Sequence, residues 1–173
     1  LGEHRRGDIE SADLAVVNPA VPESAEPVRW ARQAGVPVDR EINIVLRSLG
    51  CLTIGITGSN GKSTTTARIG AMIRRLHPAA PIGGNIGVSL LPVCESHPAN
   101  VPAVMELSSF QLKGLAETGK SPNIAVVTNI TPNHIDWHGD FADYAQSKFN
   151  ILRFQTGADI AVLNADDPIV KTW

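Results

Sequence analysis

The sequence has few of the features that mark secreted, membrane-spanning or nucleic-acid-binding proteins. Its two cysteines, Cys51 and Cys94, form neither a C-x-x-C motif nor a disulfide framework. No apolar run approaches the roughly 18 residues that span a bilayer, and we expect no signal peptide. The net charge of −2 gives no sign of a nucleic-acid or membrane partner. We therefore expect a cytoplasmic protein with neither of these partners.

The composition is that of a globular protein with a core, because 43% of the 173 residues are hydrophobic and 18% are charged. The chain starts at Leu1 without methionine, and residues 167–173 follow a strand and stop early in the next element. We expect a part of a longer protein, and a monomer.

Apolar runs and helical spacings alternate along most of the chain. The predicted strands lie at 51–56, 101–107, 123–128 and 158–163, and the predicted helices near 62–76, 86–94 and 140–155. This alternation predicts an α/β fold with a mostly parallel sheet covered on both faces. Ligands of such sheets bind at the carboxyl ends of the strands, so function is expected there.

The first 48 residues form a separate α/β segment. They predict a strand at 14–17, a helix near 24–34, a short edge strand at 36–38 and a helix near 41–49. These elements are too few to close a sheet. We therefore expect one domain over residues 1–48, present in part, and another over residues 49–173.

The most informative motif is T-G-S-N-G-K-S-T at residues 57–64, between a buried strand and an amphipathic helix. Glycines let backbone N–H groups surround phosphate oxygens, and the helix start adds positive potential. Lys62 would reach the outer phosphates and Ser63 would ligate Mg²⁺. An ordinary glycine turn is the alternative, and Ile56 stands where the strict pattern has glycine. The expected nucleotide-binding residues are Gly58, Ser59, Asn60, Gly61, Lys62, Ser63 and Thr64.

Glu106 is a lone carboxylate inside the apolar strand 101–107. Burying it without a partner would be costly. An acid on a strand next to a phosphate loop is a usual second contact for Mg²⁺. The structural alternative is a salt-bridged or edge-exposed glutamate.

The segment 128–140 is dense in Asn, His and Asp after an apolar strand. Such a loop suits a metal or phosphate site, with His134 as its best candidate. The alternative is a capped turn in which Asp140 begins the next helix, and this explanation suits His138.

Lys148 falls within the apolar stripe of the predicted helix 140–155, among Phe141, Tyr144 and Leu152. Its ammonium can snorkel to water. A desolvated lysine instead has a lowered pKa. Its neutral amine can act as a nucleophile or base, or add CO₂ to form a carbamate that binds a cation. The pattern alone leaves these alternatives open.

Together these motifs resemble the Mur ligases, the ATP-dependent amino-acid ligases of peptidoglycan synthesis. The motifs occur in the family's order over residues 55–167: G-I-T-G-S-N-G-K-S-T-T-T (55–66), G-G-N-I-G (83–87), E-L-S-S-F-Q-L (106–112), T-N-I-T-P-N-H-I-D-W-H-G (128–139), Y-A-Q-S-K (144–148) and V-L-N-A-D-D (162–167). The family's loop lacks the same first glycine. The E-L-S-S-F-Q segment is similar to that of the members that add D-glutamate.

The resemblance implies a P-loop Mur ligase central domain at 49–173, incomplete at its C-terminal end. It follows part of a Rossmann-like domain that binds the UDP substrate. The implied ligands are ATP, two Mg²⁺ ions, UDP-N-acetylmuramoyl-L-alanine and D-glutamate. In the segment 18–20 the chain has Asn-Pro-Ala where many relatives have Ser-Pro-Gly.

The resemblance also implies residue roles. The implied catalytic residues are Lys62 on the β- and γ-phosphates, His134 and Lys148. Ser63 and Glu106 would hold one Mg²⁺, and His134 and carbamylated Lys148 the second. The implied substrate-binding residues are Asn85, Ser108 and Gln111.

The implied reaction passes through an acyl phosphate formed from ATP. Alternatives are another Mur-type ligase, a folylpolyglutamate ligase, a P-loop regulatory ATPase, or a remnant that only binds phosphate. Because the family's C-terminal domain is not represented, we expect this chain alone to be inactive.

Overall fold

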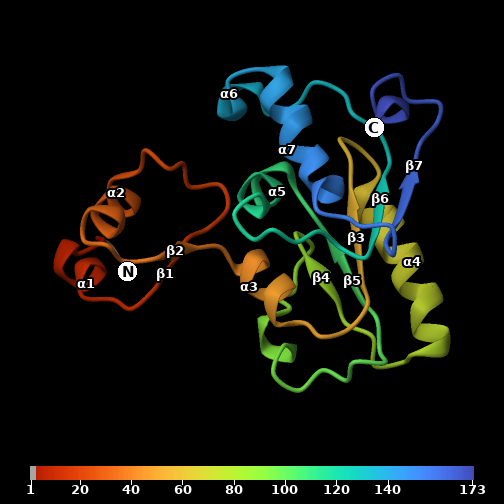
Figure 1. The fold of residues 1–173 in the computed structure, drawn as a ribbon, viewed down its shortest axis with the longest axis horizontal. Coiled ribbons are helices and arrows are strands. Elements are labelled where there is room, and N and C mark those ends of the chain that lie inside the picture. Colours follow the sequence, from red (N-terminus) through yellow and green to blue (C-terminus); the bar gives the residue numbers. More distant parts are fainter. Residues whose placement is uncertain (1–2) are drawn as a thin grey trace.

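The computed structural model describes residues 3–173, which form a five-stranded sheet flanked by helices and a smaller N-terminal segment (Figure 1). The elements in chain order are α1 (Arg6–Glu10), β1 (Ala15–Val16), α2 (Glu26–Gln33), β2 (Val38–Asp39), α3 (Glu41–Ser48), β3 (Thr53–Thr57), α4 (Lys62–Leu76), β4 (Ile82–Gly84), η1 (Leu91–Val93), β5 (Ala103–Glu106), α5 (Ser109–Leu115), β6 (Ile124–Val127), α6 (Ile135–His138), α7 (Phe141–Arg153), β7 (Ile160–Leu163) and η2 (Val170–Thr172). None of the described helices has the length and apolar character needed to cross a membrane.

The main sheet has the order β4-β5-β3-β6-β7, and all of its neighbouring strands run parallel. Ile54 of β3 lies opposite Val104 of β5 on one side and Ile124 of β6 on the other. The predicted α/β class and the parallel sheet are confirmed. Parallel strands put their carboxyl ends at one edge, so β3, β5 and β6 deliver the phosphate loop, Glu106 and the 128–140 loop to the same place.

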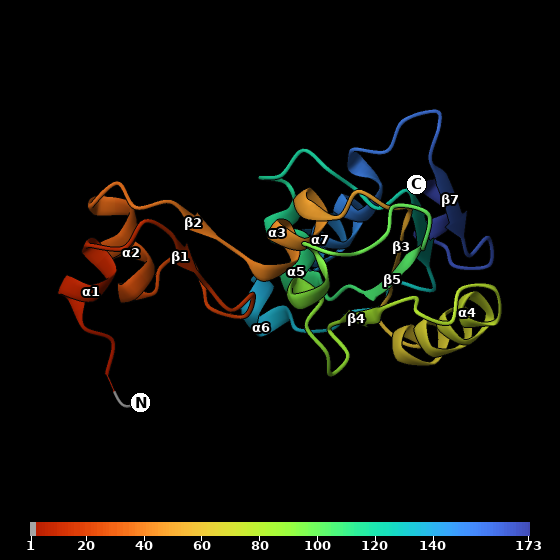
Figure 2. The ribbon, with the colours of Figure 1, turned by 90° about the horizontal axis from the view of Figure 1, so that it is seen from below.

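Alternate strand residues face opposite layers, and each layer has its own core. On one face Ile54, Ile56 and Val104 pack against Ile69 and Ile73 of α4. The other face carries the larger core, to which α3, α5 and α7 contribute. Figure 2 shows α4 on one side of the sheet and these three helices on the other. The phosphate loop is therefore anchored between a fully buried strand and a packed helix.

The N-terminal segment extends away from the main sheet (Figures 1 and 2). Its two-stranded sheet pairs Ala15 with Val38 and Val16 with Asp39 in parallel. Helix α3 then connects it to the main body, where Asn43 donates a hydrogen bond to the Gly114 carbonyl (3.3 Å). The predicted strands and helices of this segment are confirmed, although the strands are shorter than expected.

The predicted helix 86–94 is wrong. Only the 3-10 turn η1 forms there, because Gly87 adopts a positive φ of 63° and Pro92 cannot donate a backbone hydrogen bond. The strand β4 and the helices α1, α5 and α6 were not predicted. Gly84 in β4 has φ 89°, and a Cβ there would collide with the Glu106 carbonyl oxygen. Glycine thus permits the close approach of β4 to β5 that a strand-propensity pattern does not reveal.

Strand β7 forms one edge of the main sheet. Its side chains are poorly covered, since Ile160 is 54% exposed and Val162 is 50% exposed.

Candidate functional site

The phosphate loop leaves β3 at Thr57 and enters α4 at Lys62. Gly58 has φ 148°, and a Cβ there would collide with the Thr128 hydroxyl at the end of β6. Asn129 brackets the loop, because its side chain accepts from the Asn60 N–H (3.0 Å) and donates to the Asn60 carbonyl (3.0 Å). Gly61 precedes α4 in a left-handed conformation, and no side chain of residues 3–173 caps this helix start. The loop can therefore present helix N–H groups and positive potential to an anion.

Lys62 and Lys148 converge on this loop from two helices. Lys62 donates to the Gly58 and Ser59 carbonyls, both at 3.0 Å. Lys148 donates to the Gly58 carbonyl (2.9 Å) and the Thr57 hydroxyl (3.2 Å). Both ammonium groups therefore donate to oxygen atoms of the loop and its preceding strand.

Lys148 is only 1% exposed, so the snorkelling alternative is wrong. Burial, with the Lys62 charge acting in the same direction and Glu106 opposing, lowers the pKa of Lys148 to about 7. The Tyr144 ring lies 5.1 Å from its nitrogen. A substantial fraction of this lysine is therefore a neutral amine near neutral pH, which is the form that can add CO₂.

Glu106 ends the inner strand β5 and is 1% exposed, so it is not an edge-exposed residue. No ion pair connects it to a Lys, Arg or His within residues 3–173, which also argues against the salt-bridge alternative. Asn85 donates to one carboxylate oxygen (3.0 Å), and the other oxygen, Oε2, is buried without a hydrogen-bond partner. An orphaned carboxylate oxygen beside a phosphate loop fits a Mg²⁺ ligand, because a hard cation would satisfy it.

His134 stands at the start of α6 with φ 52°, the only positive φ of a non-glycine residue in the described chain. Its ring is exposed, and the Phe110 ring centroid lies 5.0 Å away. Asp140 accepts a hydrogen bond from the Asp143 N–H (2.8 Å), so the predicted cap of the following helix is confirmed.

A cavity of about 270 Å³ brings several of the predicted residues together. Its lining comprises Lys62, Asn85, Ser108, Ser109, Phe110, Asn133, His134, Tyr144 and Lys148. Sequence analysis did not assign Ser109, Phe110, Asn133 or Tyr144 to the site. The position of Tyr144 one turn before Lys148 on the same helix face could have placed it at the site. Its hydroxyl lies 2.9 Å from Ser59 Oγ in the phosphate loop.

Of the other predicted residues, Ser63, Thr64 and Gln111 lie outside this lining, whereas Ser108 is part of it. Ser63 and Thr64 are exposed at the start of α4. Ser108 and Gln111 form the capping box of α5, in which Gln111 Oε1 accepts from the Ser108 N–H (2.9 Å) and hydroxyl (3.1 Å). The Ser108 hydroxyl and Gln111 Oε1 are therefore engaged with each other. Within residues 3–173 no three His, Cys, Asp or Glu side chains cluster around a cation position. Glu106 and His134 would thus need hydroxyl, carbamate or phosphate oxygens to complete a metal shell.

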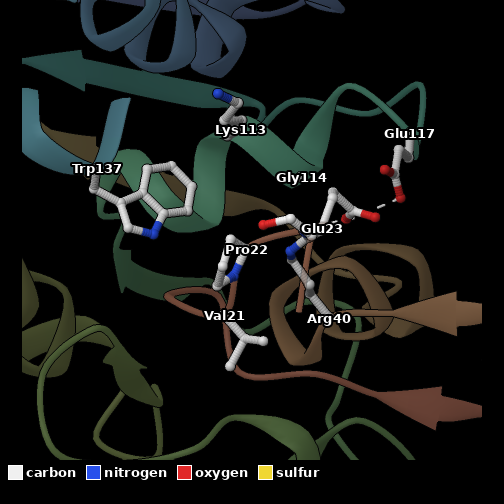
Figure 3. A pocket seen from close by; sticks show the side chains of 9 residues that line it. Val21, Pro22, Glu23, Arg40, Lys113, Gly114, Glu117 and Trp137 are labelled. Atoms are coloured by element: carbon white, nitrogen blue, oxygen red, sulfur yellow. Dashed lines mark hydrogen bonds and ion pairs between the residues drawn. The ribbon is translucent and has the colours of Figure 1, made fainter. Parts of the chain in front are cut away.

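A larger cavity of about 460 Å³ lies where the N-terminal segment meets the main body (Figure 3). In Figure 3, Trp137 and Lys113 line one side, while Val21 and Pro22 line another. Arg40 donates to Glu23 (2.8 Å), and the Trp137 Nε1–H donates to the Ala20 carbonyl (2.9 Å). The loop 18–22 is thereby tied to the helix that follows His134.

The Mur ligase middle domain model matches residues 56–173. The chain belongs to the Mur ligase family. Mur ligases in general use ATP and Mg²⁺, which agrees with the phosphate loop and the orphaned Glu106 oxygen of this Mur ligase chain.

Similar sequences and structures are members of the same family. The chain is 43% identical to a UDP-N-acetylmuramoylalanine--D-glutamate ligase of Roseiflexus sp. (strain RS-1) over 99% of this chain and 37% of that protein. It is 44% identical to the ligase of the same name from Anaeromyxobacter dehalogenans (strain 2CP-C), over 97% of this chain and 36% of that protein. The chain therefore spans little more than a third of these relatives.

Solved structures show the same fold at lower identity. The UDP-N-acetylmuramate:L-alanyl-gamma-D-glutamyl-meso-diaminopimelate ligase from Neisseria meningitides superposes with a TM-score of 0.65 and 18% identity, over 96% of this chain and 57% of that chain. MurF from Acinetobacter baumannii gives a TM-score of 0.56 and 18% identity, over 97% of this chain and 44% of that chain. At these identities the likeness supports the fold alone.

Proposed function

We propose that this Mur ligase chain is the phosphate- and metal-binding part of a longer enzyme that joins D-glutamate to UDP-N-acetylmuramoyl-L-alanine. The observation that carries the proposal is the cavity in which Lys62, His134 and Lys148 meet beside the phosphate loop. The names of the 43% and 44% identical relatives support D-glutamate as the added amino acid.

In the proposed reaction, a carboxylate oxygen of the sugar nucleotide attacks the γ-phosphorus of ATP, and ADP leaves. The amine of D-glutamate then attacks the acyl carbon, phosphate leaves, and the amine loses a proton. Lys62 would exchange its two carbonyl partners for phosphate oxygens, and the start of α4 would orient the same anion. The phosphate loop thus supplies charge and orientation rather than a nucleophile.

Bound Mg²⁺ would reduce the repulsion between the carboxylate and the triphosphate. Ser63 and Glu106 would hold one ion beside the nucleotide. His134 and a carbamate on Lys148 would hold the second. The buried position of Lys148 and its pKa of about 7 support a carbamate, since CO₂ adds to the neutral amine.

Domain and substrate assignments belong to the same proposal. Residues 1–48 would form the second half of a domain that binds the UDP substrate, and residues 49–173 the ATP-binding domain. Asn85, Ser108 and Gln111 would lie near the muramoyl-alanine end. The monomeric state, the cytoplasmic location and the inactivity of the chain alone stay predictions.

Membership in the family argues against the regulatory ATPase alternative, so the remaining competitors are ligases that add another amino acid. The test is product analysis with the full-length protein, ATP, Mg²⁺ and UDP-N-acetylmuramoyl-L-alanine. D-glutamate, L-glutamate, meso-diaminopimelate and D-alanine are supplied singly, and products are identified by mass spectrometry. We expect amide and ADP with D-glutamate alone. ADP release without amide, or amide with a different amino acid, contradicts the proposal.

A further inference from the structure

His134 occupies a backbone conformation that it does not prefer. A φ of 52° is left-handed, a conformation that few residues with a Cβ adopt and that costs about 1–2 kcal/mol. The residue is exposed, and its ring makes one aromatic contact, with Phe110 at a centroid distance of 5.0 Å. Helix α6, which His134 begins, has only four residues and is too short to be stable by itself. The constraint must therefore come from contacts that α6 makes with other elements.

Two side chains of α6 supply those contacts. Trp137 donates to the Ala20 carbonyl of the N-terminal segment (2.9 Å). His138 Nδ1 lies 2.7 Å from Asp143 Oδ2 on α7, and His138 Nε2 lies 3.0 Å from the Ser109 hydroxyl at the start of α5. Helices α5 and α7 also contribute the cavity residues Ser109 and Lys148. His138 thus connects α6 to both of these helices, and Trp137 adds a ring contact to Phe110 of α5 at 4.7 Å.

The donors and acceptors of this link have one consistent arrangement. Partial burial would raise the pKa of Asp143, but hydrogen bonds from Lys113 and His138 hold it below its usual value, so Asp143 is a carboxylate. Burial lowers the pKa of His138 despite the neighbouring carboxylate. Because the Asp143 carboxylate can only accept, His138 donates to it from Nδ1, and Nε2 pairs with the Ser109 hydroxyl at 3.0 Å. The His138 side chain is fully buried, so water cannot replace either partner.

We propose that His138 is a positioning residue that holds His134 in its strained conformation over the cavity by locking α6 to Ser109 and Asp143. The inference rests on the proposed function, because it assumes that His134 contacts the second cation. Partners that orient a metal-binding histidine commonly change metal affinity when they are removed. His138 acts on the cation through His134 and has no contact with it.

Ser109, His138 and Asp143 also stand in the order of a nucleophilic triad. In such a triad the Ser109 hydroxyl would be the nucleophile and would become acylated. Substituting Ser109 by alanine would then abolish the reaction. Lys113 donates to both oxygens of Asp143 at 2.9 and 2.7 Å, which weakens the support that Asp143 gives to an imidazolium. The geometry favours orientation over nucleophilic attack.

The test compares substitutions that remove one arm of the link at a time in the full-length protein. H138N keeps a donor near Asp143 and loses the acceptor for Ser109. H138Q places an amide near Ser109 and loses the donor to Asp143. Ser109→Ala removes a single hydroxyl group, so it still tests the link if the His138 variants do not fold. Ser147→Ala is the matched control, because its hydroxyl is buried beside the same ring at a marginal 3.5 Å.

The main measurement is Mn²⁺ titration by electron paramagnetic resonance with a non-hydrolysable ATP analogue, which needs no turnover. We expect the Mn²⁺ site that includes His134, taken as the weaker of the two, to lose affinity by about tenfold in H138N and Ser109→Ala. The loss in H138Q should lie between that of the wild type and that of H138N. The tighter site, the KM for ATP and the Ser147→Ala control should stay unchanged. A matching rise in the Mg²⁺ concentration for half-maximal ligation is expected.

Unchanged Mn²⁺ affinities with only a lower melting temperature would overturn the inference and make the link structural. Labelling of Ser109 by a fluorophosphonate in the wild type would overturn it in favour of the triad. If the wild type forms no amide with D-glutamate, the proposed function fails, whereas the Mn²⁺ titration still decides the role of His138.

Discussion

Lys62 and Lys148 donate hydrogen bonds to the same acceptor, the carbonyl oxygen of Gly58, at 3.0 and 2.9 Å. The two lysines come from α4 and α7, on opposite faces of the sheet. Their proximity contributes to the lowered pKa of Lys148, after the larger effect of burial. In the proposed function Lys62 would move to a phosphate, and Lys148 would still hold the Gly58 carbonyl oxygen. The loop can therefore exchange one cation contact for an anion contact without losing its other support.

Lys62→Ala should reduce ligation strongly without unfolding the protein. Lys62 is half-buried, its ammonium donates to two loop carbonyls and it belongs to neither hydrophobic core, so its removal leaves the core intact. The loss of a charge-assisted contact in the transition state should lower kcat on the order of 100-fold to 1,000-fold. The measurement is amide formation, with circular dichroism to check folding and the exposed Lys120→Ala as a control. Near-native turnover would remove Lys62 from the phosphate site.

Glu106→Gln should raise the Mg²⁺ requirement while keeping the strand. The amide preserves the shape of the side chain and can still accept from Asn85. It removes the negative charge at Oε2, the buried oxygen without a hydrogen-bond partner that we propose as a Mg²⁺ ligand. We expect the Mg²⁺ concentration for half-maximal ligation to rise about tenfold or more. Glu95→Gln, at an exposed glutamate, serves as the control. Equal Mg²⁺ saturation of the variant and the wild type would make Glu106 structural.

Lys148→Met should change how stability depends on pH. The folded pKa is about 7, below the ordinary 10.5, so between these values the unfolded chain binds a proton that the folded chain lacks. Wild-type stability therefore rises with pH across this window and is lost as pH falls toward 7. The free energy of unfolding of the wild type, minus that of Lys148→Met, should become more positive by about 1 kcal/mol for each unit by which the pH is raised.

Urea unfolding at pH 7, 8 and 9 measures this difference. Lys120→Met should show no such trend, because Lys120 is exposed. Parallel pH profiles for the wild type and Lys148→Met would mean that Lys148 stays charged.

Gly84→Ala should destabilise the protein more than Gly87→Ala. Both glycines have positive φ, 89° and 63°, but a Cβ on Gly84 would collide with the Glu106 carbonyl oxygen, whereas Gly87 faces open space. We expect a loss of about 1 kcal/mol from the conformation of Gly87→Ala and about 2–3 kcal/mol for Gly84→Ala. Thermal unfolding measures both, and equal losses would show that β4 and β5 can separate.

The features predicted from the sequence are those that depend on local pattern. The phosphate loop is contiguous, and the helical spacing that places Lys148 among Tyr144 and Leu152 needs only α7 itself. Strand β4 escaped prediction because its glycines adopt strand geometry only through pairing with β5. The contact between His138 and Ser109 joins residues 29 positions apart on different helices, and no periodicity reveals it. Tertiary contacts of this kind follow from the packing of α5 against α7.

The open side of β7 makes this sheet a template for another strand. Ile160 and Val162 expose apolar side chains on one face of β7, and an edge strand can pair with an extended segment of matching register. A further strand added beside β7 would extend the sheet and could cover these two side chains. A lysine at position 162 would act as a gatekeeper against that addition.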